Sequence, residues 1–206
     1  SAASDVYKRQ VVVQCNQSID KLTELKEMDP DNEYFDIYKA EVRAIRAMYY
    51  YYLLDMFARV PIVESSLTQM KDVKQSERSE VFNFVKKELE ESIPLLVDEK
   101  SAAQGEYYGR MTKAAAYFLM AKLALNAEVY TDIPKWGEAL KYADKVISSG
   151  YGLCSNYEYL FMADNGENAE TRKEMILPIR QDGIKIRTFG GALLSLIHIS
   201  EPTRPY

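Results

Sequence analysis

This sequence of 206 residues is poor in the residues on which most metal sites and many active sites depend. It holds one histidine, His198, and two cysteines, Cys15 and Cys154, which lie far apart in no metal-ligand spacing. No Ser–His–Asp set exists without His198, and no glycine-rich phosphate loop is present. These absences argue against an enzyme, a metal site and a bound cofactor.

The chain also lacks a long apolar run and an excess of positive charge. No stretch approaches the roughly 18 apolar residues that span a membrane. The net charge is −5, whereas proteins that bind nucleic acids usually present a basic patch, so a nucleic-acid partner is not expected. With 47% hydrophobic and 28% charged residues, the composition is that of an ordinary globular protein.

Both ends of the chain differ from the rest. Residues 1–10 and 194–206 resemble translated adapters of transposase-based sequencing libraries. We therefore expect the natural protein to comprise about residues 11–193, a fragment of a longer gene. His198 lies in the second segment, so it is given no catalytic or metal role. The alternative is a natural C-terminal strand over residues 193–199.

Apolar residues that recur at three- and four-residue steps predict an all-α fold. The pattern is clearest in residues 35–58, a long central helix that should end before Pro61. Its buried face is predicted to consist of Val42, Ile45, Met48, Tyr49, Tyr52, Leu53, Met56 and Phe57. Its opposite face then carries Arg43, Arg46, Tyr50 and Asp55. The two arginines could bind an anion or a sugar hydroxyl, but at helical spacing they are expected to pair with carboxylates such as Glu41 or Asp36, or to extend over the apolar face.

Four further helices are predicted from the same period. They cover residues 11–28, 79–93, 112–130 and 132–150, with N-caps at Ser79, Thr112 and Asp132. In the last helix the residues predicted to face inward are Trp136, Leu140, Ala143 and Ile147. Residues 174–180 form a short strand-like run, which Pro178 restricts to the edge of a sheet. Together these elements predict antiparallel helix hairpins of the tetratricopeptide kind, without a clean 34-residue repeat.

Five short motifs follow one another along the chain. The first is Ala40-Glu-Val-Arg-Ala-Ile-Arg-Ala-Met-Tyr-Tyr50 followed by Val60-Pro61-Ile62, and the others lie within residues 78–90, 109–116, 136–153 and 174–177. In kind and in order these motifs resemble those of the SusD/RagB-like proteins, and the match spans nearly all of residues 14–180. The chain is therefore identified as a partial member of that family, a SusD-like helical domain over residues 11–193.

The resemblance implies a lipoprotein exposed on the outer-membrane surface of Gram-negative bacteria and built on tetratricopeptide-like helices. Such proteins bind extracellular glycans, or in some members peptides, and act as a lid on a SusC-like TonB-dependent transporter. They are binding proteins and not enzymes, and the lipid anchor would lie outside this fragment. A fragment should also leave apolar surface that the missing part would cover, so we expect poor solubility. The competing hypothesis is a tetratricopeptide-like adaptor that binds protein partners.

Tyrosine supplies the candidates for ligand binding. The chain has 16 tyrosines, whose apolar ring and polar tip suit both half-buried helix faces and carbohydrate-binding surfaces. In the segment 105–110, Tyr107 and Tyr108 could stack on a sugar ring, although turn chemistry before the following helix explains the segment equally well. Residues 164–168 carry oxygen ligands but lack the spacing of an EF-hand calcium loop, so no metal site is assigned.

Overall fold

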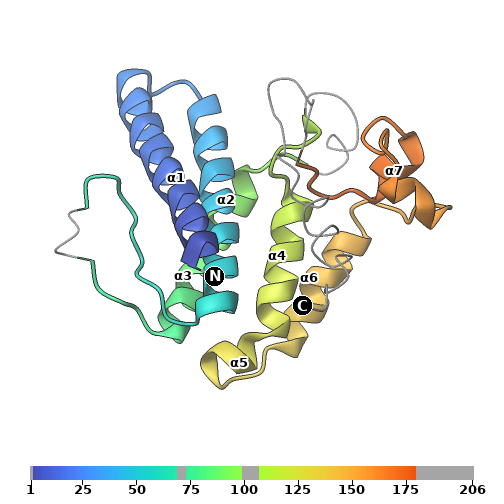
Figure 1. Cartoon of the computed structure of the whole chain (residues 1–206). Coiled ribbons are helices and arrows are strands. Elements are labelled where there is room, and N and C mark those ends of the chain that lie inside the picture. The colour runs from blue at the N-terminus through green and yellow to red at the C-terminus, as the bar shows by residue number, and fades with distance from the viewer. Residues whose placement is uncertain (1, 69–72, 99–106, 180–206) are drawn as a thin grey trace, which may run out of the picture.

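The computed structural model describes residues 2–68, 73–98 and 107–179, with side chains from Lys8 onward. Within these residues the chain forms antiparallel helices. Two long helices, α1 (Ala2–Met28) and α2 (Tyr34–Phe57), make a first hairpin, and α4 (Lys113–Leu125) and α6 (Trp136–Ile147) lie side by side as a second pair (Figure 1). The predicted adapter segment 194–206, with His198, lies outside the described residues.

Shorter elements connect and extend these two pairs. Helix α3 (Arg78–Ser92) runs into a 3-10 turn, η2 (Ile93–Leu95), and packs against α2 and α4. It also contacts α5 (Ala127–Thr131), a short helix that Asn126 separates from α4, so the helix predicted over 112–130 is divided in two. A C-terminal segment holds the 3-10 helix η5 (Tyr157–Phe161) and α7 (Ala169–Glu174).

The prediction of an all-α fold is confirmed, but the edge strand predicted at 174–180 is wrong over the described residues. Glu174 ends α7, and residues 175–179 adopt no strand; Arg180 lies outside the description. The Met175 N–H donates to the Thr171 carbonyl at 3.2 Å, which continues the helical turn. A strand needs a neighbouring strand to receive its hydrogen bonds, and the described part of the chain places none beside this run.

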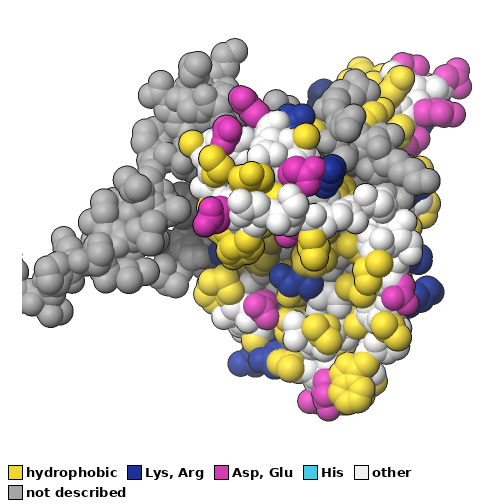
Figure 2. Space-filling model, turned by 90° about the vertical axis from the view of Figure 1, so that its right-hand side faces the viewer, with side chains coloured by type: hydrophobic (Ala, Val, Ile, Leu, Met, Phe, Trp, Pro, Cys, Tyr) yellow, Lys and Arg dark blue, Asp and Glu magenta, His cyan; other side chains and the backbone are white. Residues whose placement is uncertain are grey.

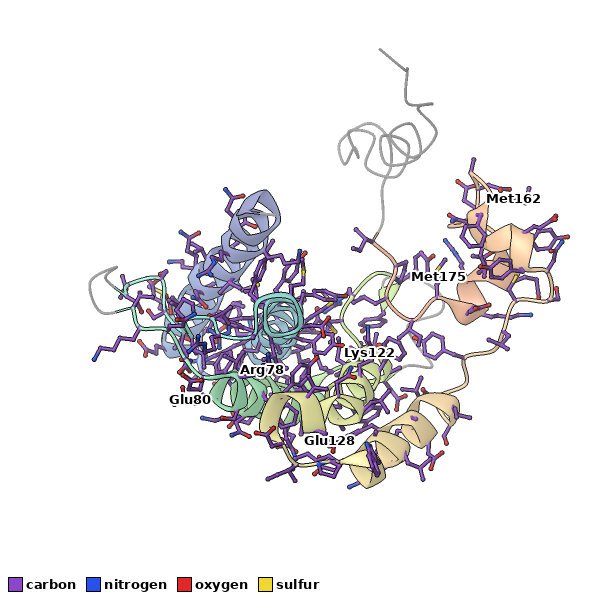
Figure 3. The ribbon with its side chains drawn as sticks, turned by 60° about the horizontal axis from the view of Figure 1, so that its bottom comes forward. Arg78, Glu80, Lys122, Glu128, Met162 and Met175 are labelled. Atoms are coloured by element: carbon purple, nitrogen blue, oxygen red, sulfur yellow. The ribbon has the colours of Figure 1, made fainter. Side chains whose placement is uncertain are left out.

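One of the three predicted N-caps is confirmed and two are wrong. The Thr112 hydroxyl accepts the Ala115 N–H at 3.3 Å and caps α4 as expected. Helix α3 begins at Arg78, before Ser79, because Glu77 and Glu80 form a reciprocal capping box there. Figure 3 labels Arg78 and Glu80 at this end of the helix. Asp132 adopts a left-handed conformation, φ 60°, and ends α5 instead of starting α6.

The predicted buried face of α2 is confirmed only in part: Leu53 is buried and Ile45, Met48, Tyr49 and Phe57 pack against the core, but the most buried positions lie to one side of this face. The residues buried on α2 are Ala40, Ala44, Arg46, Ala47, Tyr50, Tyr51, Leu53 and Leu54. Tyr52 and Met56, which were expected inside, are exposed. The alanines let neighbouring helices approach closely, and the charge of Arg46 is neutralised by a carboxylate on α3. Side-chain size and charge pairing, more than apolar spacing, therefore decide which face of α2 lies inside.

Helix α6 turns its apolar stripe outward, against the prediction. Trp136, Leu140 and Ile147 are 62%, 65% and 75% exposed, while Ala139 and Tyr142 are buried. Hydrophobic side chains lie open on the side of the molecule that carries α6 and α7 (Figure 2). The apolar residues of α6 do lie on one face of the helix, as predicted, but that face is exposed. Among the described helices α6 packs chiefly against α4, which covers only the side with Ala139 and Tyr142.

This outward stripe should make the chain self-associate. We expect the triple substitution Trp136→Gln, Leu140→Gln and Ile147→Gln to increase solubility at unchanged net charge, because it removes a contiguous apolar patch from the surface. The melting temperature should not fall, since these side chains already contact water. Light scattering and size-exclusion chromatography at rising concentration would measure the effect.

The matched control replaces exposed apolar residues on three separate elements, Leu125→Gln, Val129→Gln and Leu153→Gln. It should improve solubility less, because isolated exposed apolar residues are normal on protein surfaces. A wild-type chain that stays monodisperse at high concentration would contradict the prediction.

Candidate functional site

A buried ion-pair network joins α2 to α3. Arg46 donates to Glu88 Oε2 from Nη2 at 2.5 Å and from Nε at 3.0 Å, and both side chains are almost fully buried. Arg43 donates to the other oxygen of Glu88 at 2.6 Å and to Glu91 at 2.5 Å. The arginines pair with carboxylates as predicted, but the partners come from α3 and not from α2.

The same network holds the segment that follows α2. Arg46 also donates to the Glu64 carbonyl at 2.9 Å and to Asn16 Oδ1 at 2.8 Å, and Asn16 Nδ2 donates to the Val63 carbonyl at 2.8 Å. The Val63 N–H in turn donates to the Tyr50 hydroxyl at 2.8 Å. The polar groups of this network face one another, so it anchors residues 63–64 and offers little to a ligand.

Cys15 on α1 lies beside this network and has no reactive character. It is buried, and this burial raises the pKa of its thiol to about 11, against a smaller opposing effect of the nearby Arg46 charge. A thiol that stays protonated at neutral pH is a poor nucleophile and a poor metal ligand. Cys15 is therefore a packing residue, in line with its isolation in the sequence.

The two candidate tyrosines before α4 are placed differently. Tyr108 is 7% exposed, and the Arg172 guanidinium lies 4.6 Å from its ring centroid. Tyr107 is half-buried and contacts Arg110, whose guanidinium lies 5.0 Å from the ring centroid. Of the two, Tyr107 is the one near open surface.

Arg110 joins Tyr107 to the first turns of α2. Its guanidinium also lies 5.5 Å from the ring centroid of Tyr38, and it binds Glu41 through two hydrogen bonds of 2.5 and 3.2 Å. These bonds to Glu41 raise the pKa of Arg110, which keeps the cation charged. Tyr34, one helical turn before Tyr38, lies 6.3 Å from it between ring centroids at an interplanar angle of 27°. We call these five residues, Tyr34, Tyr38, Glu41, Tyr107 and Arg110, the tyrosine cluster.

Sequence reasoning missed the α2 half of the tyrosine cluster. Tyr34 and Tyr38 are four residues apart in a segment rich in carboxylates, and both point to solvent. Two large aromatic rings at helical spacing on a polar helix face are the signal that could have revealed them. The contact with Arg110, 69 residues from Glu41 along the chain, could not be read from that spacing.

A cavity of about 260 Å³ lies between α2 and α4. Its lining is mainly apolar and includes Met48, Tyr49, Tyr52, Phe118 and Lys122. Lys122, which extends from α4 in Figure 3, lies 5.7 Å from the ring centroid of Phe118. Ligand pockets usually exceed about 300 Å³ and combine apolar walls with several polar groups. Among the described residues that line this cavity there is no carboxylate, so the tyrosine cluster is better equipped for a hydroxyl-rich ligand.

The remaining classes of site find little support. In the part of the chain that the structure describes, no three His, Cys, Asp or Glu residues gather as a metal site would require. In residues 164–168, Asn165 donates to the Leu160 carbonyl at 2.8 Å and Asn168 caps α7, so this run serves local turns. No described helix has the length and apolarity to cross a membrane.

Comparison with known proteins gives a consistent result. The sequence model of the SusD-like family, described as starch-binding and associating with the outer membrane, matches residues 4–125. The starch-binding protein SusD of Bacteroides thetaiotaomicron is 42% identical over 154 residues, which is 75% of this chain and 27% of that relative. The chain thus spans about a quarter of that relative's length.

Solved structures agree on the fold. A laminarin-binding SusD-like protein superposes with a TM-score of 0.68 at 27% identity, covering 82% of this chain and 35% of that one. A structure with xylogluco-oligosaccharide superposes with a TM-score of 0.65 at 26% identity, covering 82% of this chain and 33% of that one. A SusD-like protein of Bacteroides fragilis superposes with a TM-score of 0.64 at 24% identity, covering 82% of this chain and 31% of that one. At this identity the likeness supports the fold alone.

Proposed function

Because this chain belongs to the SusD-like family, whose members bind starch and associate with the outer membrane, we propose that it captures glycan at that membrane's outer surface. Its role is binding and not catalysis. The observation that carries the proposal is the family match over residues 4–125 together with 42% identity to a starch-binding relative. The glycan would pass to a SusC-like TonB-dependent transporter, with the protein held by a lipid anchor.

The structure supports this proposal through the tyrosine cluster. Sugar rings carry an apolar C–H face and a rim of hydroxyls, so they favour sites where exposed aromatic rings adjoin hydrogen-bonding groups. Tyr34, Tyr38 and Tyr107 supply the rings, and the paired Arg110 and Glu41 supply donors and acceptors. Tyr107 thus stays a proposed ligand-binding residue, whereas the burial of Tyr108 suits it to positioning the segment.

The adaptor hypothesis is not favoured by any single feature. It rested on the helix hairpins, and relatives whose names state a glycan ligand share that fold.

The proposal is tested by glycan binding of the 206-residue chain. Affinity gel electrophoresis with starch, laminarin or xyloglucan in the gel should retard the chain, because these are the glycans stated for its relatives. The same gel without glycan, and heat-denatured chain, are the controls. If none of the three glycans retards the folded chain, the proposal fails for this part of the protein.

A further inference from the structure

Two tyrosine rings at the start of α2 stay open to water although large apolar surfaces are usually covered. Tyr34 is 66% and Tyr38 42% exposed, and neither side chain belongs to the hydrophobic core or to its packed edge. Their rings stack at 27° with centroids 6.3 Å apart, and we call this compact aromatic surface, one helical turn long, the aromatic shelf. The fold gains little from these side chains, which leaves room for a role in binding.

The shelf is held in place by charged groups beside it. Arg110 lies over Tyr38 and Tyr107 and is fixed by two hydrogen bonds to Glu41, whose side chain is 12% exposed. Lys26 pairs with Asp36 at 2.9 Å on the adjoining turn of α2. The donors and acceptors at the edge of the shelf are therefore oriented before any ligand arrives, which lowers the entropy cost of binding.

The charge around the shelf is negative. Residues 29–41 contain five carboxylates and Lys39, and the two cations that contact this segment are Lys26 and Arg110. Five carboxylates against three cations leave two negative charges in excess. A uronic-acid or sulfated glycan would be repelled there, whereas a neutral sugar would not.

From these observations we propose that Tyr34, Tyr38, Tyr107, Arg110 and Glu41 form a subsite for neutral pyranose units of a glycan. The C–H face of a sugar packs on the more exposed Tyr34 ring and the open edge of Tyr38, and its hydroxyls bond Arg110 and Glu41. The subsite rests on the proposed glycan-binding function and adds to it a location and a preference for uncharged sugars.

The test compares two exposed aromatic pairs in the whole chain. The Tyr34→Ala/Tyr38→Ala variant should bind laminarin or starch about tenfold more weakly or worse, because stacking residues contribute strongly to such sites. Tyr34→Phe/Tyr38→Phe keeps the rings and should retain most of the affinity. The melting temperature should stay that of the wild type, since neither ring lies in the core.

The matched control is Tyr157→Ala/Phe161→Ala on η5. This helix carries two aromatic rings that are 72% and 71% exposed and inclined at 59° to each other. η5 belongs to the C-terminal segment, at whose outer edge Met162 lies in Figure 3. This control should bind neutral glucan like the wild type. Polygalacturonate, a polymer of uronic acid, should bind the wild type far more weakly than neutral glucan does.

The outcomes separate the two proposals. If the wild type binds neutral glucan and the Tyr34→Ala/Tyr38→Ala variant binds equally well, the subsite is overturned while the glycan-binding function stands. Equal losses of glucan affinity in Tyr34→Ala/Tyr38→Ala and in Tyr157→Ala/Phe161→Ala also overturn the subsite. Tight binding of polygalacturonate overturns the preference for neutral sugars. If the wild type binds no glycan, both proposals fall together.

Discussion

Replacing Glu88 by alanine should lower the free energy of unfolding by about 3–5 kcal/mol, because it leaves the buried cation of Arg46 without its partner. For a chain of this size the melting temperature should fall by about 6–20 °C. Arg46 also holds Asn16 and the Glu64 carbonyl, so loss of its position would release the segment after α2. Thermal and urea unfolding followed by circular dichroism would measure the change.

Two further variants make this result specific. Glu90→Ala removes a carboxylate from the exposed side of the same helix, where it pairs with Lys86 at 3.8 Å, and should cost less than about 1 kcal/mol. The double variant Arg46→Met/Glu88→Leu should recover part of the lost stability, since apolar residues can replace a buried ion pair but leave Asn16 and the Glu64 carbonyl without their donor. A Glu88→Ala variant that melts with the wild type would show that Arg46 is not truly desolvated.

The second large effect is expected at Phe82 on α3. Its side chain is 1% exposed, and Phe82→Ala should cost about 3–5 kcal/mol through lost apolar burial and the cavity left behind. The ring lies 6.3 Å from that of Tyr130, whose hydroxyl donates to Asp55 at 2.8 Å. Burial and the Asp55 carboxylate raise the pKa of Tyr130, so this bond persists at neutral pH.

Phe118→Ala on α4 is the matched control. Phe118 is 45% exposed and lines the cavity between α2 and α4, so truncation should cost less than about 1 kcal/mol. Chemical denaturation of both variants gives the comparison directly. If Phe82→Ala and Phe118→Ala lower the free energy of unfolding equally, α3 is not the core element that its burial indicates.

The sequence was a good guide wherever burial follows apolar spacing. On α3 the predicted residues Phe82, Val85 and Leu89 are buried, and on α4 Leu119 and Leu123 are too. The all-α class and the antiparallel arrangement followed from such stripes and are correct. Capping at Thr112 followed from a hydroxyl placed directly before the apolar run, whereas the same signal at Ser79 failed because α3 is capped earlier, by Glu77 and Glu80.

Prediction failed where burial depends on partners far along the chain. Arg46 was placed on the polar face of α2 because its charge argues for water, but Glu88, 42 residues later, makes its burial tolerable. Trp136 was placed inside because it is apolar, but no described element lies against its side of α6. The tyrosine cluster was predicted only in part, since Tyr38 meets Arg110 through the tertiary fold and Tyr34 joins the cluster through Tyr38.

The Arg46–Glu88 pair also sets a lower limit on the stretch of this fold that can be stable by itself. The α1–α2 hairpin is complete at Phe57, but by itself it lacks Glu88, the counter-ion of the Arg46 guanidinium. A stable unit must therefore extend through α3.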